Sequence, residues 1–292
     1  MMYDKPKLPS RDELADIFFD TEKFYKADAD LQQSIQKSIE GSKVYVEDDY
    51  PAFDKDKFDR TAVYVSRYRT FQTARYHAQR DPSARIGVLN FASAVNPGGG
   101  VLKGSRAQEE ALCRCSTLYA VISNEKFVEP FYRYHQKRHD VRYTDRCIYS
   151  PDIVMIKSDI GRPERLTADQ WLKVDVLICA APNLRELPNN KFNPGNDNAL
   201  KVSDDELFDI HVKRGEHILT IAAHHGIDIL ILGAFGCGAF RNNPSVVADA
   251  YKEVLSKFEG AFKEIVFAVY CPPNQSDDNY RAFNRMFGRK KS

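Results

Sequence analysis

The sequence predicts an α/β protein with a three-layer α/β/α architecture and a helical extension at its N-terminus. From residue 61 onward, six apolar runs of strand length alternate with helical patterns, which is the order of elements in such folds. Several runs are continuously apolar, as expected for strands covered on both faces of a sheet. Two glycine clusters directly follow two of these runs, at the edge where open α/β sheets bind ligands.

The composition is that of a globular protein without a specialised surface. The 292 residues are enough to bury a large core, and 43% are hydrophobic. The 42 basic and 41 acidic residues leave a net charge of +1, so we expect no direct sequence-specific nucleic-acid binding. No stretch resembles a secretory signal or is long enough to cross a membrane. We therefore expect a soluble, cytoplasmic protein.

The cysteines do not indicate a metal site. None of them has Cys-x-x-Cys spacing, and in a reducing compartment we expect them to behave as small buried hydrophobic residues. They are Cys113, Cys115, Cys147, Cys179, Cys237 and Cys271. We predict no structural metal, and the sequence leaves the oligomeric state open.

Residues 1–58 form the predicted N-terminal helical extension, and residues 59–292 form the main domain. Ser10 followed by Glu13 has the spacing of a helix N-cap with a capping box. Leu31, Ile35 and Ile39 then recur at helical spacing, and Gly41 ends the pattern.

The main domain alternates between the two kinds of element. Strands are expected at 62–68, 86–91, 153–157, 174–180, 227–232 and 265–270. Helices are expected at 71–79, 108–123, 204–224, 244–258 and 276–287. Pro244 suits the first turn of a helix that Asn242 or Asn243 would cap. Residues 183–198, rich in proline and asparagine, are predicted to form a loop.

The first glycine cluster, Gly98-Gly-Gly100, is followed by Gln108-Glu109-Glu110 at the start of a helical pattern. Glycines let backbone N–H groups approach a polar ligand closely. Ser105 and Gln108 have capping-box spacing, which predicts a helix start near Ser105 with both glutamates in its first turn. By itself this is also the pattern of ordinary helix-start carboxylates.

Glu109 and Glu110 are neighbours in a helix, so their side chains point about 100° apart. They therefore cannot flank one bond like the paired carboxylates of ordinary glycosidases. We expect one to meet the reacting centre and the other to hold sugar hydroxyl groups.

The second cluster, Gly233-Ala-Phe-Gly-Cys-Gly-Ala-Phe240, would meet the first at the same sheet edge. Two such loops suit an extended ligand with a diphosphate in its middle. A P-loop motif is absent, which disfavours a nucleoside triphosphatase. Gly236-Cys-Gly238 is followed by Arg241 where a dinucleotide-binding motif has its third glycine, so a dehydrogenase is only a weak alternative.

These motifs together resemble the microbial branch of the poly(ADP-ribose) glycohydrolases. Asn96-Pro-Gly-Gly-Gly100, seven residues and Gln108-Glu-Glu110 resemble the family's glycine and Gln-Glu-Glu signature. The segments around Leu89, around Tyr149-Ser-Pro-Asp and at Cys179-Ala-Ala-Pro-Asn183 are also similar to that branch, as is the second glycine cluster. The resemblance covers roughly residues 60–275 and leaves the N-terminal extension outside.

The resemblance implies a macrodomain with a mixed, roughly six-stranded sheet. It also implies hydrolysis of the ribose–ribose bond of poly(ADP-ribose), acting mainly in exo fashion. By motif position Glu110 would be the catalytic acid, Glu109 would hold ribose hydroxyls, and Gln108 would orient the site. The remaining implied substrate contacts are Asn90, Asn96, Gly98, Gly99, Gly100, Gly236, Cys237, Gly238, Ala239 and Phe240.

The implied partners are ADP-ribose and ADP-ribosylated macromolecules, and the resemblance implies no metal or organic cofactor. Two alternatives use the same ADP-ribose cradle: hydrolysis of mono-ADP-ribose from a protein or nucleobase, and a module that binds ADP-ribose without cleaving it. The intact Gln-Glu-Glu motif disfavours the second, because binding an anion alone does not require two neighbouring carboxylates.

Overall fold

The structure, a computed structural model, describes residues 8–186, 201–272 and 276–288. Within them lies one seven-stranded sheet with the order β1-β4-β5-β3-β6-β7-β2. The strands are β1 Lys43–Tyr45, β2 Ala62–Ser66, β3 Ile86–Phe91, β4 Cys147–Met155, β5 Leu172–Cys179, β6 Ile229–Leu232 and β7 Glu264–Ala268. Strands β5, β3, β6, β7 and β2 run parallel, whereas β4 is antiparallel to β5 and β1 is antiparallel to β4. The sheet is therefore mixed, as expected.

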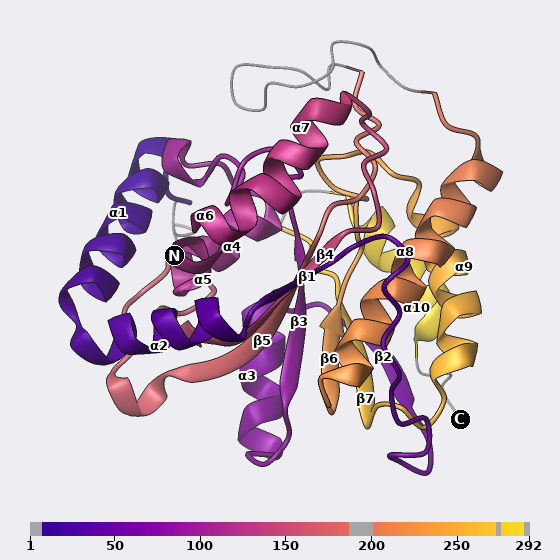
Figure 1. The fold of residues 1–292 in the computed structure, drawn as a ribbon, viewed down its shortest axis with the longest axis horizontal. Coiled ribbons are helices and arrows are strands. Elements are labelled where there is room, and N and C mark those ends of the chain that lie inside the picture. Colours follow the sequence, from indigo (N-terminus) through magenta and orange to yellow (C-terminus); the bar gives the residue numbers. More distant parts are fainter. Residues whose placement is uncertain (1–7, 187–200, 273–275, 289–292) are drawn as a thin grey trace, which may run out of the picture.

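Helices cover both faces of this sheet (Figure 1). The described α-helices are α1 Arg11–Ala27, α2 Ala29–Gly41, α3 Thr70–Arg80, α4 Gln108–Cys115, α5 Leu118–Ile122, α6 Glu125–Phe127, α7 Tyr134–Arg138, α8 Asp204–His224, α9 Pro244–Leu255 and α10 Asp278–Phe287. Helices α1 to α5 contribute to the core on one face, and α8, α9 and α10 to the core on the other. The three-layer α/β/α prediction is confirmed.

Strand β3 shows how the sequence produces these layers. Val88 is buried in the core that contains Phe71 of α3 and Leu112 of α4. The next residue, Leu89, is buried in the core that contains Ile218 of α8. Successive side chains of a strand point to opposite faces, so a continuously apolar strand is buried on both sides.

The N-terminal segment begins as the sequence predicts. The Ser10 hydroxyl accepts a hydrogen bond from the Glu13 N–H, and the Glu13 carboxylate accepts one from the Ser10 N–H. Thr21 of α1 donates a hydrogen bond of 2.6 Å to the Arg114 carbonyl of α4. Buried Lys157 forms an ion pair with Asp20 at 2.7 Å. These contacts fix α1 against the main domain. The domain boundary after residue 58 remains a prediction.

Two predicted features of the sheet are corrected. The sheet has seven strands instead of about six, because residues 43–45, which lie within the predicted helical extension, pair with β4 as β1. Strand β4 begins at Cys147, six residues before the expected start at 153. A shift in its pairing with β5 between Ser150 and Ile153 breaks the regular alternation. Because of this irregularity, the first half of the strand does not show the regular alternation of apolar residues from which a strand is predicted.

The helix expected at 108–123 is two helices, α4 and α5. Ser116 separates them, since it forms an isolated bridge to Met155 beside β4. The helix start predicted near Ser105 is also wrong. Helix α4 begins at Gln108 with Ala107 at the N-cap, and no side chain caps it. Glu109 and Glu110 nevertheless lie in its first turn, as predicted.

The other helix starts are closer to expectation. Helix α8 has the predicted bounds, and Asn243 caps α9 with Pro244 in its first turn. The expected loop at 183–198 lies mostly outside the described residues. All six cysteines are free, and only Cys271 is more than slightly exposed. Across the described ranges, no helix has the length and apolar character needed to cross a membrane.

Candidate active site

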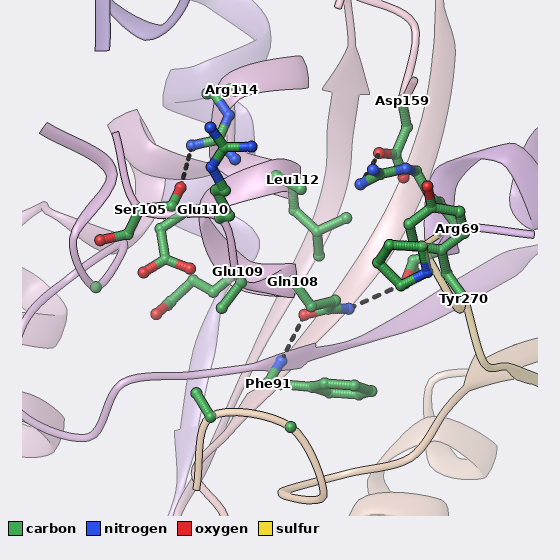
Figure 2. A pocket seen from close by; sticks show the side chains of 18 of the residues that line it. Arg69, Phe91, Ser105, Gln108, Glu109, Glu110, Leu112, Arg114, Asp159 and Tyr270 are labelled. Atoms are coloured by element: carbon green, nitrogen blue, oxygen red, sulfur yellow. Dashed lines mark hydrogen bonds and ion pairs between the residues drawn. The ribbon is translucent and has the colours of Figure 1, made fainter. Parts of the chain in front are cut away.

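The two glycine clusters meet at the carboxyl ends of β3 and β6, which are neighbours in the sheet. A cavity of about 840 Å³ opens there, and Gly99, Gly100, Gly236 and Gly238 line it. This volume is in the range of sites that enclose a sizeable organic ligand. The predicted convergence of the two loops is therefore present, and Figure 2 shows the side chains that surround the cavity.

Glu109 lines the cavity from the first turn of α4 but is only 2% exposed. Its Oε1 accepts a hydrogen bond of 3.1 Å from Asn90 Nδ2, and its Oε2 accepts one of 2.7 Å from the Ser93 N–H. Burial, followed by the charge of Glu110, raises the pKa of Glu109 to about 8. The neutral form of Glu109 is therefore favoured at neutral pH.

Glu110 is held differently. Its Oε1 accepts a hydrogen bond of 2.9 Å from the Gly100 N–H, so the glycine loop fixes the carboxylate. Its Oε2 is buried and has no hydrogen-bond partner among the described residues. A buried carboxylate oxygen without a partner is costly for a folded protein. This oxygen belongs to a cavity-lining residue, so a ligand can supply the missing partner.

Gln108 braces the start of α4 against β3. Its side-chain oxygen accepts a hydrogen bond from the Phe91 N–H at 2.9 Å, and its Nε2 donates to the Leu89 carbonyl at 2.8 Å. The same Nε2 donates to the Thr70 hydroxyl at 3.1 Å. These bonds explain why Gln108 does not form the predicted capping box. They also support the expected role of Gln108 in orienting the site.

Glycine is required at Gly99 and Gly236. Gly99 has a φ of +58°, and a Cβ there would lie 2.6 Å from Glu110 Oε1. Gly236 has a φ of +78°, and a Cβ there would lie 2.6 Å from the Ala181 methyl carbon. A larger residue would combine backbone strain with a clash at both positions.

The structure separates the predicted site residues into two groups. Those that line the cavity are Gly99, Gly100, Gln108, Glu109, Glu110, Gly236, Gly238, Ala239 and Phe240. The others, Asn90, Asn96, Gly98 and Cys237, are not among the residues that line it. Asn90 instead holds Glu109, and the Asn96 carbonyl accepts a hydrogen bond from the Gly99 N–H at 2.9 Å. Cys237 is buried, and this burial raises the pKa of its thiol.

Sequence reasoning missed several residues of the cavity wall. The Arg69 guanidinium lies 4.1 Å from the centre of the Tyr270 ring and 3.9 Å from Asp159 Oδ1. Figure 2 shows these three on one side of the cavity and Arg114 on another. The centres of the Phe91 and Phe235 rings lie 5.5 Å apart. In Figure 2, Phe91 lies below the glutamates. Only Phe91 had a local signal, its place at the end of a predicted strand.

No group of three or more histidine, cysteine or acidic side chains in the described ranges has the geometry of a metal site.

The sequence and the fold both match known proteins. A family model described as the catalytic domain of microbial-type poly(ADP-ribose) glycohydrolase matches residues 18–158. The solved poly(ADP-ribose) glycohydrolase of Deinococcus radiodurans in complex with ADP-ribose is 30% identical and has a TM-score of 0.71. That match covers 86% of this chain and 96% of the other. This chain belongs to the microbial-type poly(ADP-ribose) glycohydrolase family.

Other solved structures of this glycohydrolase family are also similar to this chain. The enzyme of Thermomonospora curvata is 28% identical with a TM-score of 0.78, over 94% of this chain and 99% of that one. The same enzyme bound to the inhibitor ADP-HPD has a TM-score of 0.76, at 28% identity over 93% and 98% of the two chains. No curated protein sequence gives a match.

The family match corrects one expectation about extent. The motifs resemble the family only from about residue 60, but the matched segment starts at Phe18, inside α1. Part of the N-terminal segment therefore belongs to the glycohydrolase sequence pattern. This agrees with the contacts that α1 makes to α4 and to Lys157.

Proposed function

We propose that this protein hydrolyses the ribose–ribose O-glycosidic bond of poly(ADP-ribose) and releases ADP-ribose, with Glu110 as general acid and base. The observation that carries the assignment of Glu110 is its Oε2, buried at the cavity and without a partner in the described structure. Its other oxygen is fixed by the Gly100 N–H. A general acid needs this combination of a held carboxyl group and one oxygen available to the substrate.

The reaction proceeds in two proton transfers. Glu110 Oε2 donates a proton to the leaving ribose oxygen as the glycosidic bond breaks, leaving positive charge on the anomeric carbon of the retained unit. The ionised Glu110 then takes a proton from water as the water oxygen bonds to that carbon. The carboxyl group ends in its starting state, and one water molecule is consumed.

Glu109 is the neighbouring source of the proton. Burial, followed by the charge of Glu110, raises the pKa of Glu109 to about 8, so Glu109 can hold a proton near neutral pH. In this proposal that proton reaches the leaving oxygen through Glu110 Oε2, the carboxylate oxygen that has no other partner in the described structure. Hydrogen bonds from Asn90, Ser93 and the Gly98 backbone use three of the roughly four acceptor sites of the Glu109 carboxylate, which leaves one for a ribose hydroxyl.

We assign the ADP-ribose diphosphate to the loop Gly236, Cys237, Gly238 and Ala239. A Cβ at Gly238 would meet no other atom within 4 Å, so the cavity is open at that residue. Phe240, which also lines the cavity, would pack beside the terminal ribose. The substrates are ADP-ribosylated macromolecules that carry the polymer.

The test compares the wild type with Glu110→Gln on poly(ADP-ribosyl)ated and on mono-ADP-ribosylated protein. We expect the wild type to release ADP-ribose from the polymer, and Glu110→Gln to lose about 1,000-fold of that activity, within the range of general acid catalysis. Glu253→Gln, at an exposed position of α9, is the matched control. Binding of ADP-ribose without release by the wild type would instead indicate a reader. Release from mono-modified protein alone would indicate a mono-ADP-ribosyl hydrolase.

A further inference from the structure

A buried amide, that of Asn242, lies against the loop to which we assign the diphosphate. Asn242 is 2% exposed and is not among the residues that line the cavity. Its backbone N–H donates a hydrogen bond of 3.1 Å to the Gly236 carbonyl. A Cβ at Gly236 would lie 2.8 Å from the Cγ and the Oδ1 of Asn242. The amide and the loop are therefore closely packed, so a rotation of the amide would displace Gly236.

The same amide joins two segments of the chain. Asn242 Nδ2 donates a hydrogen bond of 2.7 Å to the Pro182 carbonyl and one of 3.2 Å to the Phe240 carbonyl. Pro182 belongs to the segment that follows β5, and Phe240 follows the loop directly. Carbonyl oxygens only accept hydrogen bonds, so the two carbonyls require Nδ2 on their side and Oδ1 on the other.

His211 of α8 holds the other end of the amide. Its Nε2 lies 2.7 Å from Asn242 Oδ1, and because Oδ1 only accepts, the proton is on Nε2. His211 is 1% exposed, and burial lowers the pKa of its imidazole to about 4, so the ring is neutral at neutral pH. Its Nδ1 is buried and has no partner in the described structure. A buried ring with an unpaired nitrogen is costly, which calls for a reason other than stability.

The loop has few hydrogen bonds of its own. Among the described residues, none accepts a hydrogen bond from the N–H groups of Gly238 and Ala239. The loop closes with a hydrogen bond of 3.2 Å from the Arg241 N–H to the Gly238 carbonyl, and Arg241 has a φ of +62°. A residue other than glycine keeps such a conformation only where its surroundings hold it. Asn242, the next residue, provides that support.

We infer that His211 and Asn242 are positioning residues, which hold the loop of Gly236 to Ala239 in the conformation that binds a diphosphate. The inference rests on the proposed function, in which this loop binds the diphosphate of ADP-ribose. A loop that is held in its binding conformation does not have to be ordered by the ligand, and this raises the affinity. Loss of the hydrogen bond from His211 therefore weakens substrate binding and leaves the proton transfers of Glu110 unchanged.

The experiment compares two substitutions of His211. His211→Leu removes the donor to Asn242 Oδ1, whereas His211→Gln keeps an N–H group that can replace it. Calorimetry measures the Kd for ADP-ribose, and steady-state kinetics on poly(ADP-ribose) measure kcat and KM. We expect His211→Leu to raise both Kd and KM about tenfold, the effect of one buried hydrogen bond, and to change kcat less than about twofold. His211→Gln should restore most of the affinity.

The matched control is His217→Leu, which removes another buried histidine of α8. The ring nitrogens of His217 lie 2.7 Å from the Asp145 carbonyl and 3.0 Å from the Asp49 carbonyl, and neither carbonyl belongs to the loop. This variant should lower Tm, which is measured for every variant, and leave Kd and KM unchanged. An equal loss of affinity in His217→Leu and His211→Leu would overturn the inference, because both would then reflect reduced stability alone.

Other results would also overturn it. These are an unchanged Kd in folded His211→Leu, a loss confined to kcat, and a Kd for His211→Gln as weak as that for His211→Leu. If His211→Leu does not fold, Asn242→Ala removes the amide beside Gly236 and should weaken ADP-ribose binding at least about tenfold. Retained affinity in that variant would count equally against the inference. If the wild type neither binds ADP-ribose nor cleaves the polymer, it is the proposed function that fails.

Discussion

Glu109→Gln should stabilise the fold at alkaline pH while it impairs the active site. Burial and then the nearby charge of Glu110 raise the pKa of Glu109, so both favour its neutral form. The introduced amide is neutral at every pH. It also finds partners, because Asn90 Oδ1 is buried without a partner in the described structure. A flip of the Asn90 amide lets this oxygen accept from the new N–H, while the new carbonyl accepts from the Ser93 N–H.

The size of the effect follows from the raised pKa. Between 4.5 and about 8 the folded chain binds more protons at Glu109 than the unfolded chain, so the free energy of unfolding falls as the pH rises through this window. At 1.36 kcal/mol per pKa unit, the penalty is about 4 kcal/mol at pH 8 and below about 1 kcal/mol at pH 5. Below pH 8 both the protonated Glu109 and the introduced amide are neutral, so the exchange itself changes the hydrogen-bond energy little. We therefore expect the variant to be about 4 kcal/mol more stable than the wild type at pH 8, and equal to it within about 1 kcal/mol at pH 5.

The assay is urea unfolding of both proteins from pH 5 to pH 8. Other titrating groups are common to both and cancel in the difference, and Glu253→Gln should show no trend with pH. A difference in unfolding free energy that stays constant across this range would refute the argument that burial and the charge of Glu110 keep Glu109 protonated. Activity on the polymer should fall at every pH, since the carboxylate that accepts ribose hydroxyls is lost.

The other predictions concern backbone geometry and the anchoring of α1. Gly99→Ala should cut kcat about 100-fold in a folded protein, because its Cβ would displace the Glu110 carboxylate; full activity would contradict this. Gly236→Ala, at a φ of +78°, should lower the free energy of unfolding measured in urea by about 2 kcal/mol. Gly238→Ala should leave the free energy of unfolding unchanged, and calorimetry should show weaker binding of ADP-ribose. Equal stability of the two variants would show that the loop is not strained. Thr21→Val should destabilise by about 1–2 kcal/mol through the unpaired carbonyl of α4, seen as a lower Tm than for the wild type.

The sequence by itself determined the layers of the fold and the chemical centre of the site. Continuous apolar runs such as β3 require burial on both faces, and this needs no knowledge of distant residues. Gly98 to Gly100 and the glutamates at the start of α4 lie within about a dozen residues of one another. Local chain geometry therefore sets their arrangement, and they were predictable together.

Only the tertiary structure decided what surrounds that centre. Strand β1 forms because it can pair with the edge of β4. Gln108 does not form the expected capping box because its side chain hydrogen-bonds to Phe91, Leu89 and Thr70 instead. Arg11 reaches the cavity although about a hundred residues separate it from Glu110. Contacts between residues so far apart depend on how the layers pack, and packing leaves no periodic or compositional signal in either segment.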